Sequence, residues 1–144
     1  QYNAWANRRV IGCLERQAVT DEKIVSIFAH CVAANFIWYN RFMGLPKSDY
    51  KLWGGGYTIA DLKKMVEEAN ELWMSFIDSN NSFDRVLKYH NYVENNIQDI
   101  MIHLVNHGSY HRGQVAVLLR ERGYEPINTD LITYDRVLLG QWKD

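Results

Sequence analysis

Apolar residues recur every three or four positions over most of the chain, which is the period of an amphipathic helix. The first such stretch covers residues 2–16. The second begins after Thr20 and Asp21, whose side chains suit a helix N-cap, and continues to about Met43, where a Gly-Leu-Pro sequence stops it. The pattern therefore predicts two helices joined by a short connection.

A loop with three consecutive glycines precedes the third predicted helix. Thr58 and Asp61 stand three residues apart in the pattern of a capping box, and the apolar period that follows continues to about Ser79. The segment 85–93 is ambiguous, because its residues fit a short strand or one arm of a hairpin before an asparagine caps the next helix.

The longest periodic segment covers residues 97–122, and Gly123 suits the position just after its C-terminus. Asp130 then suits the N-cap of a short terminal helix over residues 131–139. Four long helices without a repeated strand pattern predict an all-α fold, namely a four-helix bundle with a short additional C-terminal helix. A chain of 144 residues with 47% hydrophobic residues is the size of a single domain, so we expect residues 1–144 to form one.

The charge balance argues against a polyanionic partner. Sixteen Lys and Arg residues stand against 17 Asp and Glu residues, and the formal net charge of −1 gives no overall positive field for nucleic acid or an anionic membrane. No apolar run approaches the roughly 20 residues of a membrane span. Cys13 and Cys31 form neither a disulfide framework nor a CxxC metal motif. This cysteine usage fits a reducing compartment, so we expect a cytoplasmic protein.

Three histidines stand at spacings of four along the longest predicted helix and so share one face: His103, His107 and His111. Because His103 and His111 lie about 12 Å apart along the axis, one metal ion can take only one adjacent pair. A third ligand must come from elsewhere, and His30 is the natural candidate, since an unpartnered imidazole among apolar residues is costly to bury. The alternative is a chance pair and a hydrogen-bonded core histidine, and we assign His90 no role.

Two glycines in the same helix indicate a close approach. Gly108 and Gly113 each weaken a helix by about 1 kcal/mol relative to alanine, so we expect a neighbouring helix or a bound substrate to pass near them. Gln114 should share the face of the histidines, whereas Tyr110 and Arg112 should pack or contact another helix or subunit.

The stretch HLVNHGSYHRGQVAVLLRERGYEP, residues 103–126, resembles the hallmark sequence of the DinB-like superfamily of YfiT-type metalloenzymes. YNAWANRRV and AHCVAANFIWYNRF resemble that family's first helix and the helix that carries its first histidine. The resemblance implies a four-helix bundle, commonly dimeric, with a divalent metal ion held by three histidines. At the matching positions these ligands are His30, His107 and His111, which leaves His103 in the pocket or outside the ligand set.

Family members with known activities use a low-molecular-weight thiol such as bacillithiol, mycothiol or glutathione. The resemblance therefore implies a metal-dependent thiol S-transferase acting on small electrophiles, although the sequence identifies no catalytic residue beyond the ligands. Imidazole ligands suit zinc or nickel, and also iron or copper. Two alternatives stay open: a metal-dependent hydrolase that needs only water, and a non-catalytic metal-binding stress protein. The resemblance also implies a homodimer, and four tryptophans are candidates for its surface: Trp38, Trp53, Trp73 and Trp142.

Overall fold

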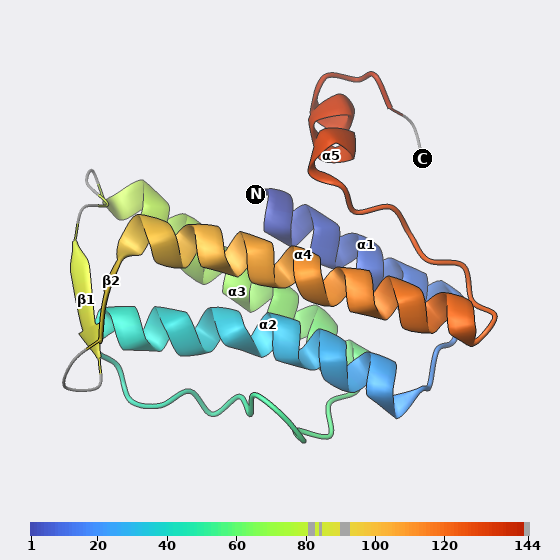
Figure 1. Cartoon of the computed structure of the whole chain (residues 1–144), viewed down its shortest axis with the longest axis horizontal. Helices are drawn as coiled ribbons and strands as arrows, with labels where there is room; N and C mark the ends of the chain where they lie inside the picture. Colours follow the sequence, from blue (N-terminus) through green and yellow to red (C-terminus); the bar gives the residue numbers. More distant parts are fainter. Residues whose placement is uncertain (81–82, 84, 90–92, 143–144) are drawn as a thin grey trace.

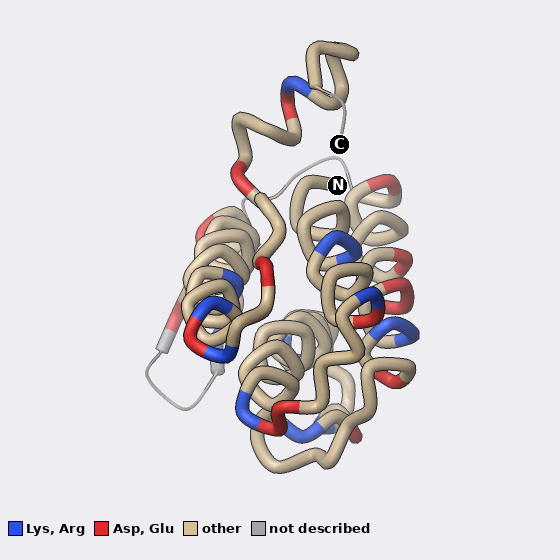
Figure 2. Tube along the Cα trace, turned by 90° about the vertical axis from the view of Figure 1, so that its right-hand side faces the viewer, with Lys and Arg blue, Asp and Glu red and all other residues tan. Residues whose placement is uncertain are grey.

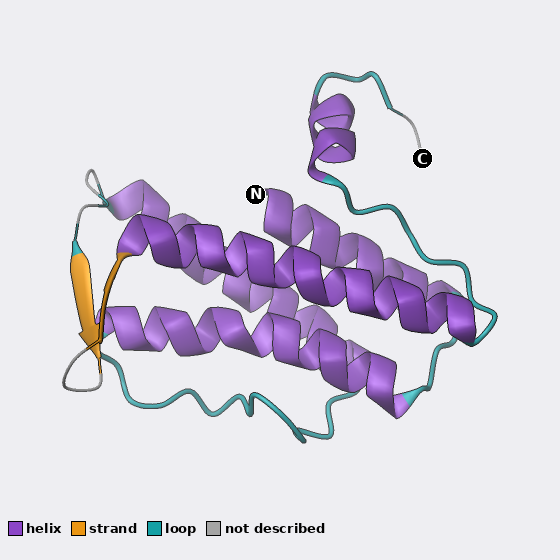
Figure 3. Cartoon of the chain, in the orientation of Figure 1, coloured by secondary structure: helices purple, strands orange, loops and turns teal. Residues whose placement is uncertain are grey.

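The computed structural model describes residues 1–80, 83, 85–89 and 93–142 of the chain. Within these residues it has the predicted all-α architecture, four long helices and a short C-terminal helix, with one small antiparallel hairpin at the end of the bundle (Figures 1 and 3). In chain order the elements are α1 (Tyr2–Arg16), α2 (Glu22–Met43), α3 (Ile59–Ser79), β1 (Val86–Tyr89), β2 (Val93–Asn96), α4 (Ile97–Glu121) and α5 (Leu131–Leu138).

The four long helices pack in the cyclic order α1, α3, α2, α4, so α1 and α2 lie diagonally although they follow each other in sequence. Helices α1 and α4 run in one direction, and α2 and α3 run in the other (Figure 1). Because α2 and α3 are parallel, segment 44–58 must return along the outside of the bundle before α3 can begin. This return path brings a loop alongside α2, next to the site described below.

Local capping chemistry sets most helix boundaries. The carboxylate of Asp21 accepts hydrogen bonds from the backbone at the start of α2, and the predicted capping box of Thr58 and Asp61 is present at the start of α3. Asn96 is the residue that caps α4. Asp130 stands at the N-cap of α5, but contrary to our expectation its side chain makes no capping hydrogen bond.

Residues 86–89 and 93 of the ambiguous segment belong to two antiparallel strands, in which Val86 pairs with Asn96 and Leu87 with Asn95. Leu87 is buried against the end of the bundle with Phe42, Phe76 and Ile97. Trp38 and Trp73 also pack against this cluster. These two tryptophans are therefore partly buried against this cluster, where we had expected surface positions.

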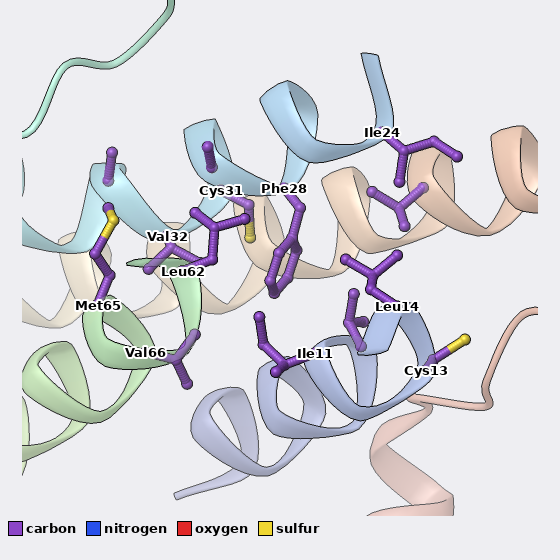
Figure 4. Packing of buried hydrophobic residues seen from close by; sticks show 14 of the residues in the cluster. Ile11, Cys13, Leu14, Ile24, Phe28, Cys31, Val32, Leu62, Met65 and Val66 are labelled. Atoms are coloured by element: carbon purple, nitrogen blue, oxygen red, sulfur yellow. The ribbon is translucent and has the colours of Figure 1, made fainter. Parts of the chain in front are cut away.

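The main core lies between α1, α2, α3 and α4 and centres on Phe28, which is fully buried. Figure 4 shows its ring reaching from α2 toward Ile11 and Leu14 of α1, with Leu62 of α3 beside it. Burial of one such ring stabilises the fold by about 1.5–3 kcal/mol. The core thus holds α2 against its diagonal partner and fixes the position of the residues that follow Phe28.

The surface carries charges of both signs, and Figure 2 shows Lys and Arg positions interspersed with Asp and Glu positions. Ion pairs join neighbouring helices at several points, for example Lys63 with Glu15 and Arg8 with Glu67. Among the described helices, none is both long enough and apolar enough to cross a membrane. Helix α5 projects beyond the four long helices and packs against the N-terminal end of α1, where Tyr134 contacts the rings of Tyr2 and Trp5.

Candidate metal centre

Three histidines from two antiparallel helices meet on one side of the bundle. His30 comes from the middle of α2, two residues after the core residue Phe28, and His107 and His111 stand one turn apart on α4. One ring nitrogen from each histidine lies within 4.8 Å of the others. The structure therefore brings together the set His30, His107 and His111 that the resemblance implies, and this cluster could hold a metal ion.

The hydrogen bonds of His30 and His111 fix which nitrogen of each ring faces the centre. Nδ1 of His30 donates to the backbone oxygen of Leu52 at 3.2 Å, and Nδ1 of His111 donates to Oε1 of Gln114 at 2.7 Å. In a neutral imidazole the second nitrogen then carries a lone pair. Both Nε2 atoms point this lone pair at Nε2 of His107, at 3.0 and 3.1 Å.

This arrangement suits a cation better than it suits three free imidazoles. Nε2 of His107 carries at most one hydrogen, so it can satisfy only one of the two lone pairs that face it. A cation accepts all three lone pairs together. For metal–nitrogen bonds of about 2.0–2.1 Å in tetrahedral geometry, the nitrogens stand about 3.3 Å apart, within a few tenths of an ångström of the separations between His107 and its two neighbours. The donor set therefore fits a divalent metal ion.

Burial favours the neutral form of two of the three histidines. The pKa of His107 is lowered to about 4, mainly by burial and further by the neighbouring His111 and His30. Burial also lowers the pKa of His30, which the contact with Leu52 partly offsets. Because metal ligation requires neutral imidazole, both shifts favour ligation at neutral pH. Nδ1 of His107 is buried without a hydrogen-bond partner in the described residues, so no acceptor orients that ring in the way that Leu52 and Gln114 orient the other two.

The loop before α3 contributes two contacts that the sequence analysis missed. Leu52 provides the backbone acceptor for His30, and the indole of Trp53 stacks on the His30 ring at 3.9 Å with an interplanar angle of 17°. We had assigned Trp53 to a subunit interface. Its indole is 55% exposed, yet its inner face covers a candidate ligand. No local pattern places this loop beside α2; only the parallel run of α2 and α3 does so.

The remaining polar residues of the motif fall where the helical period puts them. Gln114 shares the face of the histidines, as expected, and bonds to His111. His103 is exposed and its ring contacts Trp38 at 5.5 Å, outside the three-histidine cluster. Tyr110 is exposed, although its ring contacts that of His111. His90 lies outside the described residues.

The two glycines of α4 differ from each other. A Cβ at Gly108 would lie 2.5 Å from Oδ1 of Asn3 on α1, so the expected close approach of a neighbouring helix is present there. A Cβ at Gly113 would meet nothing within 4 Å, so the expected approach of a neighbouring helix is absent at that position. Arg112 is 2% exposed and contacts α1 through Asn3 and Asn7, so it serves the helix contact we expected.

A cavity of about 680 Å³ adjoins the histidine cluster. It lies between the N-terminal half of α2 and loop 51–58, and Leu52 and Trp53 line it while also contacting His30. Its polar lining includes Glu22, Ser26 and Lys51. The volume is within the range of about 300–1,000 Å³ that is typical of small-molecule sites.

Comparison with known proteins agrees with the motif and the fold. Residues 1–143 match the model of the DinB family. The chain is also similar to Protein DinB of Bacillus subtilis (strain 168), with 25% identity over 154 aligned residues that cover 93% of this chain and 90% of that protein. The resemblance read from residues 103–126 is thereby confirmed, and this chain belongs to the DinB family.

Proposed function

We propose that the chain binds one divalent metal ion through His30, His107 and His111 and transfers a low-molecular-weight thiol to small electrophiles. The supporting observation is the convergence of three Nε2 atoms, two of them on rings whose Nδ1 already has an acceptor. When bound, a divalent ion at three neutral imidazoles keeps its charge and open positions, and it lowers the pKa of a thiol or water there. Zinc or nickel suits these ligands best, and iron or copper also fits.

The protein contributes orientation and shielding. Leu52 and Gln114 hold His30 and His111 in the tautomer that presents Nε2 to the centre. Trp53 covers one face of His30 and limits the approach of water from that side. These contacts pre-organise the two ligands, so little ordering is needed when the site is filled.

The cavity beside Trp53 provides room for the reactants. Lys51 and Glu22 offer opposite charges at its wall, which suits a small thiol that carries both a carboxylate and an amine. In the proposed reaction the thiol sulfur bonds to the electrophilic carbon and the bond to the leaving group breaks. The thiol proton and the leaving group depart together as an acid, so the reaction needs no oxidant or reductant.

Metal content and activity test the proposal together. We expect His107→Ala to lose most of the bound metal and His103→Ala to keep it, because only His107 lies in the cluster. The assay follows loss of an alkyl halide, with and without glutathione, bacillithiol or mycothiol, before and after chelation. Consumption of the alkyl halide that requires both the metal and a thiol supports the proposal. Loss of the metal from the His103→Ala protein would contradict the ligand assignment.

The same experiment distinguishes the two alternatives. Hydrolysis of a test ester that needs no thiol and stops on chelation would replace thiol transfer with metal-dependent hydrolysis. Absence of both activities in the metal-loaded protein would leave a non-catalytic metal-binding protein. Cys13 and Cys31 are buried free thiols, which supports a reducing compartment such as the cytoplasm, where low-molecular-weight thiols are available.

We also propose that two copies of the chain form a homodimer through α5 and the residues just after it. Four large apolar side chains there are 53–69% exposed, on an element that packs against the bundle only at the N-terminal end of α1: Leu131, Ile132, Leu138 and Leu139. Such a concentration of apolar side chains on one short element is typical of a surface that another protein covers. A second copy would bury both sets about a two-fold axis.

Light scattering after size exclusion tests the dimer. We expect the protein at micromolar concentration to have twice the mass of the chain. The double variant Leu138→Lys, Leu139→Lys should be a folded monomer, because its like charges would face each other across the axis. A wild-type protein that is monomeric over this range would contradict the dimer, and an unchanged dimer in the variant would contradict its location.

A further inference from the structure

A buried arginine on the face of α4 that meets α1 has no acidic partner among the described residues. Arg112 is 2% exposed, and no carboxylate contacts it among the residues that the structure describes. Its acceptors are all neutral: Oδ1 of Asn3 and Asn7, and the hydroxyls of Tyr2 and Ser109. Desolvation of a cation costs several kcal/mol when no anion compensates it. The surroundings of Arg112 are therefore short of one negative charge.

Arg112 also determines how two asparagine side chains present their amide groups. Nη1 donates to Oδ1 of Asn3 at 2.7 Å and to Oδ1 of Asn7 at 2.9 Å. Both Oδ1 atoms face the guanidinium, so both Nδ2 groups point away from it. Asn7 is 4% exposed, and its Nδ2 makes no hydrogen bond within the described part of the chain. Two donors are thus held in place with a positive charge behind them.

These two asparagines line a second cavity, separate from the histidine cluster, with a volume of about 210 Å³. It lies beside the N-terminal end of α1, which begins short of the hairpin ends of α3 and α4 (Figure 1). Trp73 and Ile77 of α3 and Met101 and Leu104 of α4 form its apolar wall. None of the residues that line it has a charged side chain, and Asn3 and Asn7 lie at the α1 side.

We propose that this cavity binds a small monocarboxylate with an apolar body. The carboxylate accepts from Nδ2 of Asn3 and Asn7 and supplies the negative charge that Arg112 lacks, while the body packs against Trp73 and Met101. The volume equals roughly seven water molecules at about 30 Å³ each, which suits an acid of six to eight carbons. Charge-assisted hydrogen bonds are about twice as strong as neutral ones, so the site should discriminate against the matching amide.

Paired probes test the charge preference without use of the metal site. Hexanoate and phenylacetate are compared with hexanamide and phenylacetamide by calorimetry at pH 7, in protein treated with chelator. We expect each acid to bind about tenfold more tightly than its amide and to shift the side-chain amide resonances of Asn3 and Asn7. Absence of binding at millimolar acid, or equal affinity for acid and amide, would overturn the proposal.

Substitutions then test the location. Asn7→Asp keeps the shape of the side chain but gives Arg112 a carboxylate partner, so we expect higher thermal stability and loss of the preference for acids. Ala69→Leu adds volume at the cavity wall and should abolish binding of both probes, whereas Ala60→Leu, on the exposed side of the same helix, should bind as the wild type does. Unchanged acid binding in either Asn7→Asp or Ala69→Leu would place the site elsewhere. Because the histidines are untouched, these results are independent of the proposed thiol transfer.

Discussion

Gln114 provides a measure of how far the surroundings of the histidines prepare them for metal. Its Oε1 accepts from Nδ1 of His111 at 2.7 Å, which holds the ring in the tautomer with a free Nε2. A hydrogen bond of this kind contributes about 0.5–1.5 kcal/mol, and loss of such a partner typically lowers metal affinity by about 10- to 100-fold. An energy at the upper end of the first range corresponds to about a tenfold change in affinity, which is the lower end of the second range. We therefore expect Gln114→Ala to weaken zinc binding about tenfold, or by about 1.4 kcal/mol.

Competition with a coloured chelator measures this difference directly at pH 7.5. Gln114→Glu should bind zinc more tightly than the wild type, because a carboxylate is a stronger acceptor for the His111 proton and makes the ring a better donor. Gln98→Ala is the matched control, since Gln98 is exposed near the start of the same helix. If Gln114→Ala binds within twofold of the wild type, the contact with His111 does not prepare the site, and our account of ligand orientation fails.

The remaining predictions concern pH and packing. Because the pKa values of His107 and His30 are lowered, zinc binding at pH 7 should release few protons, as calorimetry in two buffers would show. His107 gains a proton near pH 6.5 in the unfolded chain but only near pH 4 in the folded chain. The free energy of unfolding of the metal-free protein should therefore fall as pH falls through this window. Urea denaturation should show a smaller fall for His107→Phe. On the same helix, Gly108→Ala should lower the free energy of unfolding by about 1–3 kcal/mol through the clash with Asn3, and Gly113→Ala should raise it by about 0.5–1 kcal/mol. A loss of stability in Gly113→Ala would show that something packs there.

The helices and their ends could be predicted because local physics decides them. The capping box of Thr58 and Asp61, and the asparagine before α4, act on backbone groups within three residues of themselves. The pair His107 and His111 follows from the period of one helix in the same way. The third ligand was harder, because nothing within α2 indicates which face of that helix meets α4. The apolar setting of His30 made it the candidate, the resemblance joined it to His107 and His111, and the fold brings the three together.

The contacts missed by sequence analysis are those between segments that only the topology brings together. Trp53 has the exposure of a surface tryptophan, yet it stacks on His30 because loop 44–58 must run back along α2. In the sequence Trp38 and Trp73 are candidates for the surface, but in the fold they pack against the hydrophobic cluster beside the hairpin. In each case the decisive fact is the parallel arrangement of α2 and α3, which no periodicity within a single helix can reveal.

One stretch of α4 serves both neighbouring helices, which explains its unusual composition. Successive residues on a helix are about 100° apart, so His107 and His111 face α2 while Gly108 and Arg112 face α1. Gly108 leaves the space that Asn3 and the Arg112 guanidinium occupy, and Arg112 ties α1 to the helix one residue after a candidate ligand. A change on the α1 side therefore bears on the position of the histidines without touching them. The glycine that weakens the helix and the arginine that lacks an acidic partner are parts of the same contact.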